Sequence, residues 1–203
     1  GVSAALQEYV EYLGGLKLYH PMSWGGYLGW RLNPDYKVFW DGRYIFADLL
    51  TGAVDATRSA PAWARFLKEQ DIELVALERG RLGAIPFRLF PPQSQSPLTR
   101  GIQGVPSPRR GERFVVARPA ERLYMAENNW ALLYWDSQGL LFVRRDKAEP
   151  EWLAEHEYRL LFPDDQEWLY AEARAGRLDP AAATGEVRRF LEGGADEAEK
   201  NRW

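Results

Sequence analysis

The chain has no cysteine and only two histidines in 203 residues. The absence of thiols excludes disulfides, cysteine nucleophiles and thiolate metal sites. His20 and His156 lie far apart without metal-ligand spacing, so we expect both to be surface or turn residues. No G-x-S-x-G or Walker A sequence is present, and Gly25-Gly26-x-x-Gly29 departs from the dinucleotide-binding G-x-G-x-x-G pattern. The sequence therefore predicts no metal, no cofactor and no recognisable catalytic set.

Long apolar runs and a strong excess of one charge are also lacking. No stretch approaches the roughly 18 apolar residues that span a bilayer, and the N-terminus shows no signal-peptide pattern. The formal net charge is −3, so we expect no nucleic-acid partner. The chain is 46% hydrophobic and contains nine tryptophans. This composition predicts one domain with a sizeable core, a small appendage and broad aromatic contact surfaces.

The first third of the chain alternates between helical and strand patterns. Gly14-Gly15 ends an amphipathic helix, Pro34 stops another, and Ser59 with Pro61 opens a third. The expected elements are a helix over 2–13, a strand over 16–20, a helix over 24–32 with Ser23 as its cap, a strand over 37–40, helices over 44–57 and 59–70, and a strand over 72–77. Such alternation is typical of a right-handed parallel α/β unit.

Residues 79–113 interrupt this pattern. The segment holds 5 Gly, 6 Pro and 3 Ser, together with seven Arg against one acidic residue. We expect a long inserted loop, either solvated or in contact with an anionic ligand or membrane surface. The arginines expected to make such contacts are Arg88, Arg100, Arg109 and Arg110.

The remainder predicts a C-terminal β-hairpin and trailing helices. Gly139 lies in a four-residue turn between two strand patterns, 130–135 and 140–144, after a helix over 120–128. Helices follow over 150–156, 164–175 and from Pro180, with Asp164-Asp165 as a cap. The predicted fold is α/β, a three-layer Rossmann-like mixed sheet. Its expected division is an α/β domain over 1–163 and a helical appendage over 164–203.

Asp41 and Arg43 are the strongest polar candidates, because they follow a predicted strand. Open α/β sheets bind ligands at the carboxyl ends of their strands. Asp41 could accept a hydrogen bond from a ligand hydroxyl while Arg43 pairs with an anion. Alternatively, Asp41 caps the next helix and Arg43 forms a structural ion pair.

Trp24, Tyr27 and Trp30 recur at a spacing of three residues on roughly one face of a helix. Such a stripe usually packs into a core. The alternative is an aromatic platform for a sugar ring, since Trp and Tyr combine a flat apolar face with a hydrogen-bond donor.

The run SWGGYLGWRLNPDYKVFWDGR, residues 23–43, resembles a family pattern. It is similar to the C-terminal soluble region of bacterial polytopic membrane proteins of the GT-C type, which are glycosyltransferase-like or dolichyl-phosphate-mannose mannosyltransferase-like. The matching residues are Trp24, Gly25, Gly26, Tyr27, Leu28, Trp30, Leu32, Pro34, Lys37, Val38, Phe39, Asp41, Gly42 and Arg43. The resemblance extends over 16–77 and 130–163, and the segment 79–113 has no counterpart.

The resemblance implies an α/β domain on the extracytoplasmic, periplasmic side of a bacterial membrane, after an upstream membrane-spanning portion of the same protein. GT-C enzymes carry their catalytic carboxylate between membrane spans, so this region alone would be non-catalytic. The run is also distantly similar to the W-W-D-Y-G stretch of oligosaccharyltransferases. Met22-Ser23-Trp24-Gly25-Gly26-Tyr27 lacks its Asp, so acceptor-peptide binding does not carry over.

The leading hypothesis is an accessory domain that binds or positions a glycan, an acceptor or a lipid-linked sugar phosphate. Its expected binding residues are Trp24, Tyr27, Trp30, Asp41 and Arg43, with no cofactor. The alternative is a structural or protein-interaction module without a small ligand, for which Trp152, Trp168, Tyr170 and Phe190 offer apolar faces. A free-standing enzyme is a third hypothesis that the lack of a catalytic set disfavours.

Overall fold

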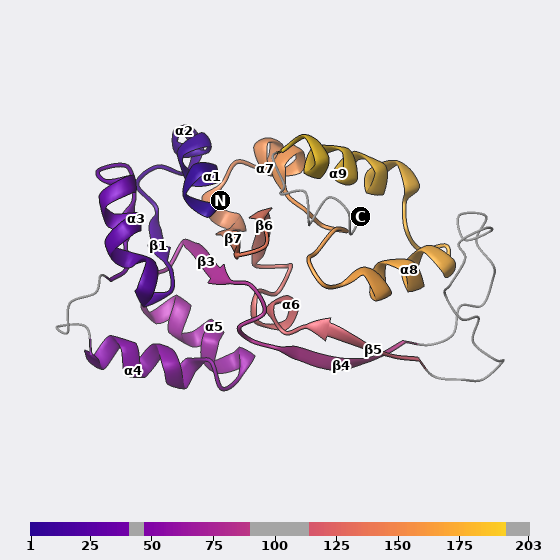
Figure 1. The fold of residues 1–203 in the computed structure, drawn as a ribbon, viewed down its shortest axis with the longest axis horizontal. Coiled ribbons are helices and arrows are strands. Elements are labelled where there is room, and N and C mark those ends of the chain that lie inside the picture. The colour runs from indigo at the N-terminus through magenta and orange to yellow at the C-terminus, as the bar shows by residue number, and fades with distance from the viewer. Residues whose placement is uncertain (41–46, 90–113, 194–203) are drawn as a thin grey trace. The chain divides into compact units, whose positions relative to one another are not determined.

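The fold comes from a computed structural model of the chain, which describes residues 1–40, 47–89 and 114–193 (Figure 1). The chain divides into two compact units. Unit 1 comprises residues 1–82 and 121–159, and unit 2 comprises residues 83–120 and 160–203. The predicted division into an α/β domain over 1–163 and a helical appendage over 164–203 stays a prediction.

Unit 1 is built on a five-stranded mixed sheet with the order β2-β1-β3-β7-β6. The strands are β1 (Lys17–Tyr19), β2 (Lys37–Val38), β3 (Leu74–Glu78), β6 (Trp130–Trp135) and β7 (Gly139–Arg144). β1 pairs in parallel with both β2 and β3. β7 adds antiparallel to β3, and β6 adds antiparallel to β7. The predicted α/β class and the hairpin at the edge of the parallel strands are confirmed.

One face of this sheet carries the main apolar core. It packs against α1 (Val2–Glu8), α2 (Val10–Leu13), α3 (Gly25–Leu32) and α7 (Pro150–His156). Leu6, Leu28 and Leu153 bring these helices into contact with the buried strand residues Leu74 and Leu141. Alternate strand residues point to this face, as the pleat of a strand requires.

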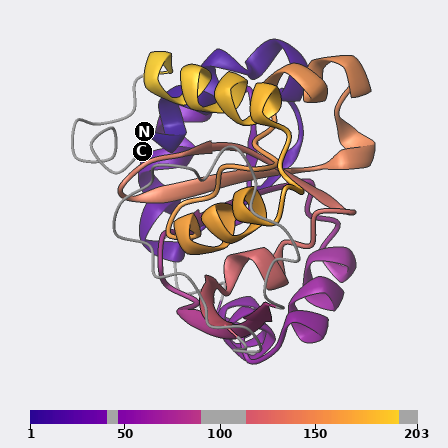
Figure 2. The ribbon, with the colours of Figure 1, turned by 90° about the vertical axis from the view of Figure 1, so that its right-hand side faces the viewer.

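The other face is covered by α5 (Ala60–Glu69) and α6 (Glu121–Tyr124), and α4 (Ala47–Ala56) packs against α5. Tyr19 of β1 meets the ring of Trp63 at a centroid distance of 5.1 Å. The indole Nε1 of Trp63 in turn donates to the sulfur of Met125 at 3.4 Å. Figures 1 and 2 both place α4 and α5 on one side of the sheet and the N-terminal helices on the other. Unit 1 therefore has the three layers that the sequence predicts.

Local signals place some helices accurately and misplace others. Ser59 caps α5 by accepting from the Ala62 amide at 3.3 Å, as predicted. The helix predicted over 2–13 is interrupted at Tyr9, which separates α1 from α2. Ser23 does not cap α3, because a 3-10 turn, η1 (Met22–Trp24), precedes the helix. The helix expected over 120–128 is limited to the four residues of α6.

The described part of unit 2 contains a two-stranded antiparallel sheet and two helices. Its elements are β4 (Ala84–Leu89), β5 (Phe114–Pro119), α8 (Gln166–Arg174) and α9 (Pro180–Glu192). The expectation of a loop through all of 79–113 is wrong for its first part. Ile85, Phe87 and Leu89 alternate with other residues at the two-residue period of a strand, and β4 pairs along its whole length with β5. Asp179 caps α9 by accepting from the Ala181 amide at 2.9 Å, as a helix opened at Asp179-Pro180 requires.

Candidate functional site

The parallel strands of unit 1 end at one edge of the sheet, where the chain changes direction. From β1 the chain crosses to β2 on one side, and from β2 it returns past β1 to β3 on the other side. This reversal makes the carboxyl ends of β1 and β3 a topological switch point, the usual place for a ligand in an open α/β sheet. His20 follows β1 at this edge, and Arg79 follows β3.

His20 lies in the connection after β1 and is completely buried, so the expected surface location is wrong. Its Nδ1 lies 2.9 Å from the carbonyl oxygen of Pro21, whereas its Nε2 has no hydrogen-bond partner in the described part of the chain. The indole of Trp40 donates to the His20 carbonyl at 2.8 Å and ties the chain after β2 to the end of β1. Burial lowers the pKa of His20, and the contact with Pro21 offsets this only in part. The imidazole is therefore neutral at neutral pH.

Tyr19, the residue before His20, belongs to an aromatic cluster on the opposite face. Its ring lies within 6.0 Å of the ring centroids of Phe39, Trp63 and Phe66. Burial raises the pKa of Tyr19 to about 12, and the charge of Arg81 lowers it by a smaller amount. A phenol with this pKa stays protonated at neutral pH, so Tyr19 is suited to packing rather than to proton transfer.

The turn between β6 and β7 reaches the same edge and is organised by Asp136. Oδ1 of Asp136 accepts from the amides of Gln138 and Gly139, both at 2.8 Å, and Oδ2 accepts from the Tyr134 hydroxyl at 2.8 Å. Arg79 donates to the Asp136 carbonyl at 3.0 Å. These hydrogen bonds hold the turn of the hairpin and occupy both carboxylate oxygens of Asp136. Asp136 therefore has a structural role.

Trp24 packs against this hairpin and against the main core. A Cβ atom built on Gly139 would lie 2.9 Å from Cη2 of Trp24, so the indole covers the glycine directly. Trp24 is half-buried and joins the cluster that contains Leu28 and Leu141. The core interpretation of the aromatic stripe is therefore right for Trp24.

Tyr27 and Trp30 behave differently, because both rings lie on the solvent face of α3. Tyr27 is 55% exposed and Trp30 is 77% exposed, whereas Leu28 and Leu32 of the same helix are buried. The two ring centroids are 6.4 Å apart with an interplanar angle of 47°. The Tyr27 hydroxyl lies 3.3 Å from Oγ of Ser3, which links this face of α3 to α1. The structure thus keeps two of the three predicted aromatic residues together, as an exposed pair.

The structure does not describe the side chains of the other predicted contact residues. Asp41 and Arg43 lie outside the described residues, as do Arg100, Arg109 and Arg110. Arg88 lies in β4, where the structure describes the backbone pairing with Val115 but not the side chain. The binding roles predicted for these residues therefore stay predictions.

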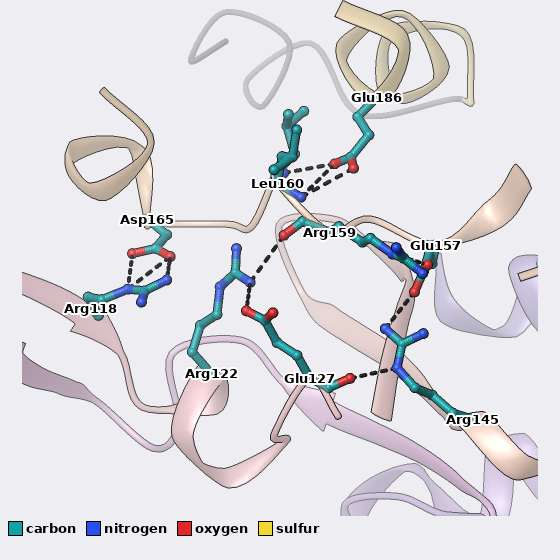
Figure 3. A network of polar contacts seen from close by, with 10 residues as sticks. Arg118, Arg122, Glu127, Arg145, Glu157, Arg159, Leu160, Asp165 and Glu186 are labelled. Atoms are coloured by element: carbon teal, nitrogen blue, oxygen red, sulfur yellow. Dashed lines mark hydrogen bonds and ion pairs between the residues drawn. The ribbon is translucent and has the colours of Figure 1, made fainter. Parts of the chain in front are cut away.

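Unit 2 contains a buried ion pair that the sequence patterns did not indicate (Figure 3). Arg118 donates from Nε and Nη2 to the carboxylate of Asp165, at distances from 2.6 to 3.2 Å. The guanidinium also lies 4.2 Å from the ring centroid of Trp168. Asp165 is the N-cap residue of α8, as predicted, but its carboxylate makes no capping hydrogen bond and binds Arg118 instead. The signal that was missed is an isolated arginine in a strand, Arg118, together with an acidic residue directly before a helix, Asp165, since the two can form an ion pair.

Figure 3 shows two further carboxylates, one bound by arginine side chains and one bound by backbone amides. Glu157 of unit 1 is buried and pairs with Arg145 at 2.6 Å and with Arg159. Glu186 of unit 2 accepts from the backbone amides of Leu160 and Leu161, the latter at 2.8 Å. The two arginines neutralise the buried charge of Glu157, and Glu186 satisfies backbone amides that would otherwise lack a partner. Both carboxylates therefore have a structural function.

A cavity of about 340 Å³ lies between α4 and α5. Its lining includes Asp48, Asp55, Glu69 and Arg65, but none of its lining residues has a buried polar atom without a partner. Within the described residues no group of three or more His, Asp or Glu could hold a metal ion. The same part of the chain contains no helix that is both long and apolar enough to cross a membrane. The exposed pair Tyr27–Trp30 is thus the feature best suited to contact a ligand.

Comparisons with protein-family models, with curated proteins and with solved structures found no match to this chain.

Proposed function

We propose that this chain is a non-catalytic binding domain that holds a sugar ring against Tyr27 and Trp30. The observation that carries the proposal is the exposure of Trp30, 77% of whose surface faces solvent beside a second exposed aromatic ring. Tryptophan is normally among the highly buried side chains, and an indole held in water costs free energy that a ligand contact recovers.

The rings stand on a rigid base, which favours binding. Leu28 and Leu32 anchor α3 in the core, and Ser3 holds the Tyr27 hydroxyl. Binding therefore requires little ordering of the protein, so less of the interaction free energy is lost. A pyranose ring offers an apolar C–H face to the flat rings and hydroxyls to their polar edges.

The biological setting is part of the same proposal. The resemblance of residues 23–43 to the soluble region of GT-C-type proteins supports an extracytoplasmic accessory domain of a membrane glycosyltransferase-like protein. Such a domain would position a glycan, an acceptor or a lipid-linked sugar near the membrane active site. The excess of arginine in 79–113 supports a contact with an anionic membrane surface or a phosphate group.

Titration with short oligosaccharides tests the binding function. Maltotriose, mannotriose and chitotriose would be added while the nine indole N–H signals are followed by NMR. We expect one of these probes to shift the Trp30 signal, and Trp30→Ala to weaken its binding about tenfold or more. Tyr170→Ala removes an exposed tyrosine of α8 in unit 2 and should leave binding unchanged. Shifts in no indole with any of the three probes would contradict the proposal.

A protein-interaction module is the second candidate, and the same exposed rings favour it. In that case neither the wild type nor Trp30→Ala would bind oligosaccharides, and Trp30→Ala would lose a protein partner that the wild type binds. Analytical ultracentrifugation of the wild type and of Trp30→Ala distinguishes the simplest case, self-association through α3.

A further inference from the structure

We propose that the sugar held by α3 is an acidic one, with a carboxylate or phosphate group bound by Arg31. This inference rests on the proposed function and names the class of ligand. We call the surface formed by Gly26, Tyr27, Trp30 and Arg31 the α3 patch.

Helical spacing makes the α3 patch continuous. Gly26 and Trp30, like Tyr27 and Arg31, are four residues apart and lie one turn above each other, and Tyr27 and Trp30 are three apart. All four residues are exposed, whereas Gly25, Leu28 and Leu32 are buried on the opposite side of α3. One face of the helix thus presents two rings and one cation to solvent.

The charge of Arg31 is available to a ligand. Its guanidinium has no ion pair or hydrogen bond with the described residues, whereas Arg118, Arg144 and Arg177 are each paired with carboxylates. A guanidinium matches the two oxygens of a carboxylate or phosphate with parallel hydrogen bonds. A cation in the last turn also stabilises the helix, but any cation would serve that purpose.

Gly26 leaves room for the ring of the ligand. A Cβ atom at this position would have no neighbour within 4 Å, so packing does not require a glycine there. Glycine in a helix is unfavourable relative to alanine. Long side chains in a helix lean towards its N-terminus, which brings Trp30 over the turn that contains Gly26. A larger residue at 26 would occupy the space in front of the indole.

The size of the α3 patch favours a sugar over a protein. The exposed parts of Tyr27 and Trp30 together offer on the order of 300 Å². A stable protein interface needs about 800 Å² from each partner. One or two sugar rings cover the smaller area fully.

Matched ligands test the charge. Trigalacturonate and its methyl ester differ in negative charge but not in their rings, and mannose 6-phosphate and mannose form a second pair. We expect the wild-type chain to bind the acid of at least one pair about tenfold more tightly than its neutral partner, and less tightly in high salt. Arg31→Gln should abolish the preference, and Arg65→Gln, which changes an exposed arginine of α5, should keep it. Preference in the first pair alone identifies a carboxylate ligand, and in the second pair alone a phosphate.

A second variant tests the space at Gly26. We expect Gly26→Leu to weaken binding of acidic and neutral ligands alike by about tenfold without lowering the thermal midpoint of unfolding. Gly52→Leu, at an exposed glycine of α4 that is equally free of neighbours, should bind as the wild type does. Equal affinity for the acidic and neutral ligands of both pairs, with binding still dependent on Trp30, would overturn the acidic-sugar inference and leave the proposed function standing. Binding of no ligand would overturn both.

Discussion

The indole of Trp24 closes over Gly139 and joins the connection after β1 to the turn of the β6–β7 hairpin. A Cβ atom on Gly139 would lie 2.9 Å from Cη2 of Trp24, 3.0 Å from Cγ2 of Val2 and 3.1 Å from the carbonyl oxygen of Leu77. The last of these atoms belongs to the backbone of β3 and cannot move aside. Trp24, Val2 and Leu77 are distant in sequence but meet at Gly139, where there is no room for a methyl group. Trp24 is the residue directly before α3.

We expect Gly139→Ala to destabilise the fold, because the added methyl group overpacks this contact. The free energy of unfolding should fall by about 1–3 kcal/mol in urea denaturation. Gly52→Ala, in the exposed interior of α4, should instead raise it by up to about 1 kcal/mol. If both substitutions stabilise the chain, Trp24 does not hold Gly139 as described.

The buried imidazole of His20 predicts a loss of stability in mild acid. Burial lowers its folded-state pKa below 6.5, so below pH 6.5 the unfolded chain binds a proton that the folded chain resists. This contribution is fully present above pH 6.5 and is lost as the pH falls through the lowered pKa. The slope reaches at most about 1.4 kcal/mol per pH unit. Urea denaturation at pH 7.5, 6.0 and 5.0 measures it.

Replacing the two histidines separately identifies the source of this pH dependence. His20→Gln should remove the slope between pH 6.5 and 5.0, and His156→Gln should retain it.

Glu73 contributes to the pH dependence of stability in a different pH range. Burial raises its pKa, but bonds from Lys147 and the Lys17 amide outweigh this and lower it below 4.5. Its contribution is lost only below pH 4.5. An unchanged slope between pH 6.5 and 5.0 in His20→Gln would contradict His20 as the source of the pH dependence in that range.

The pair Arg118–Asp165 predicts a large penalty when one partner alone is removed. Asp165→Asn leaves the guanidinium of Arg118 in a buried place without its counter-charge. We expect a loss of about 3–5 kcal/mol for the part of the chain that contains the pair, measured by hydrogen exchange of α8 and β5. Asp179→Ala removes only a helix cap and should cost about 1 kcal/mol. If the two substitutions lowered the free energy of unfolding equally, the pair Arg118–Asp165 would stabilise the chain no more than a helix cap does.

Several elements were predictable because their signals are local. Ser59 and Pro61 specify the start of α5, and the turn Asp136-Ser137-Gln138-Gly139 specifies the hairpin of β6 and β7. β4 was missed because Pro86 and nearby glycines favour a loop, whereas pairing with β5 overrides that preference. The exposed pair Tyr27–Trp30 was found as one of two interpretations of a stripe that also included Trp24.

The amino-acid sequence specifies the alternation of strands and helices, and hence an α/β fold with a mixed sheet, because periodicity and caps act over a few residues. Tertiary contacts alone pack Trp24 on Gly139 while Trp30 faces solvent, bury His20, and bring Asp165 to Arg118. Each of these depends on which distant segment lies opposite the residue. Spacing along one helix cannot supply that information, because a stripe of aromatic residues has the same period whether it meets a hairpin or water.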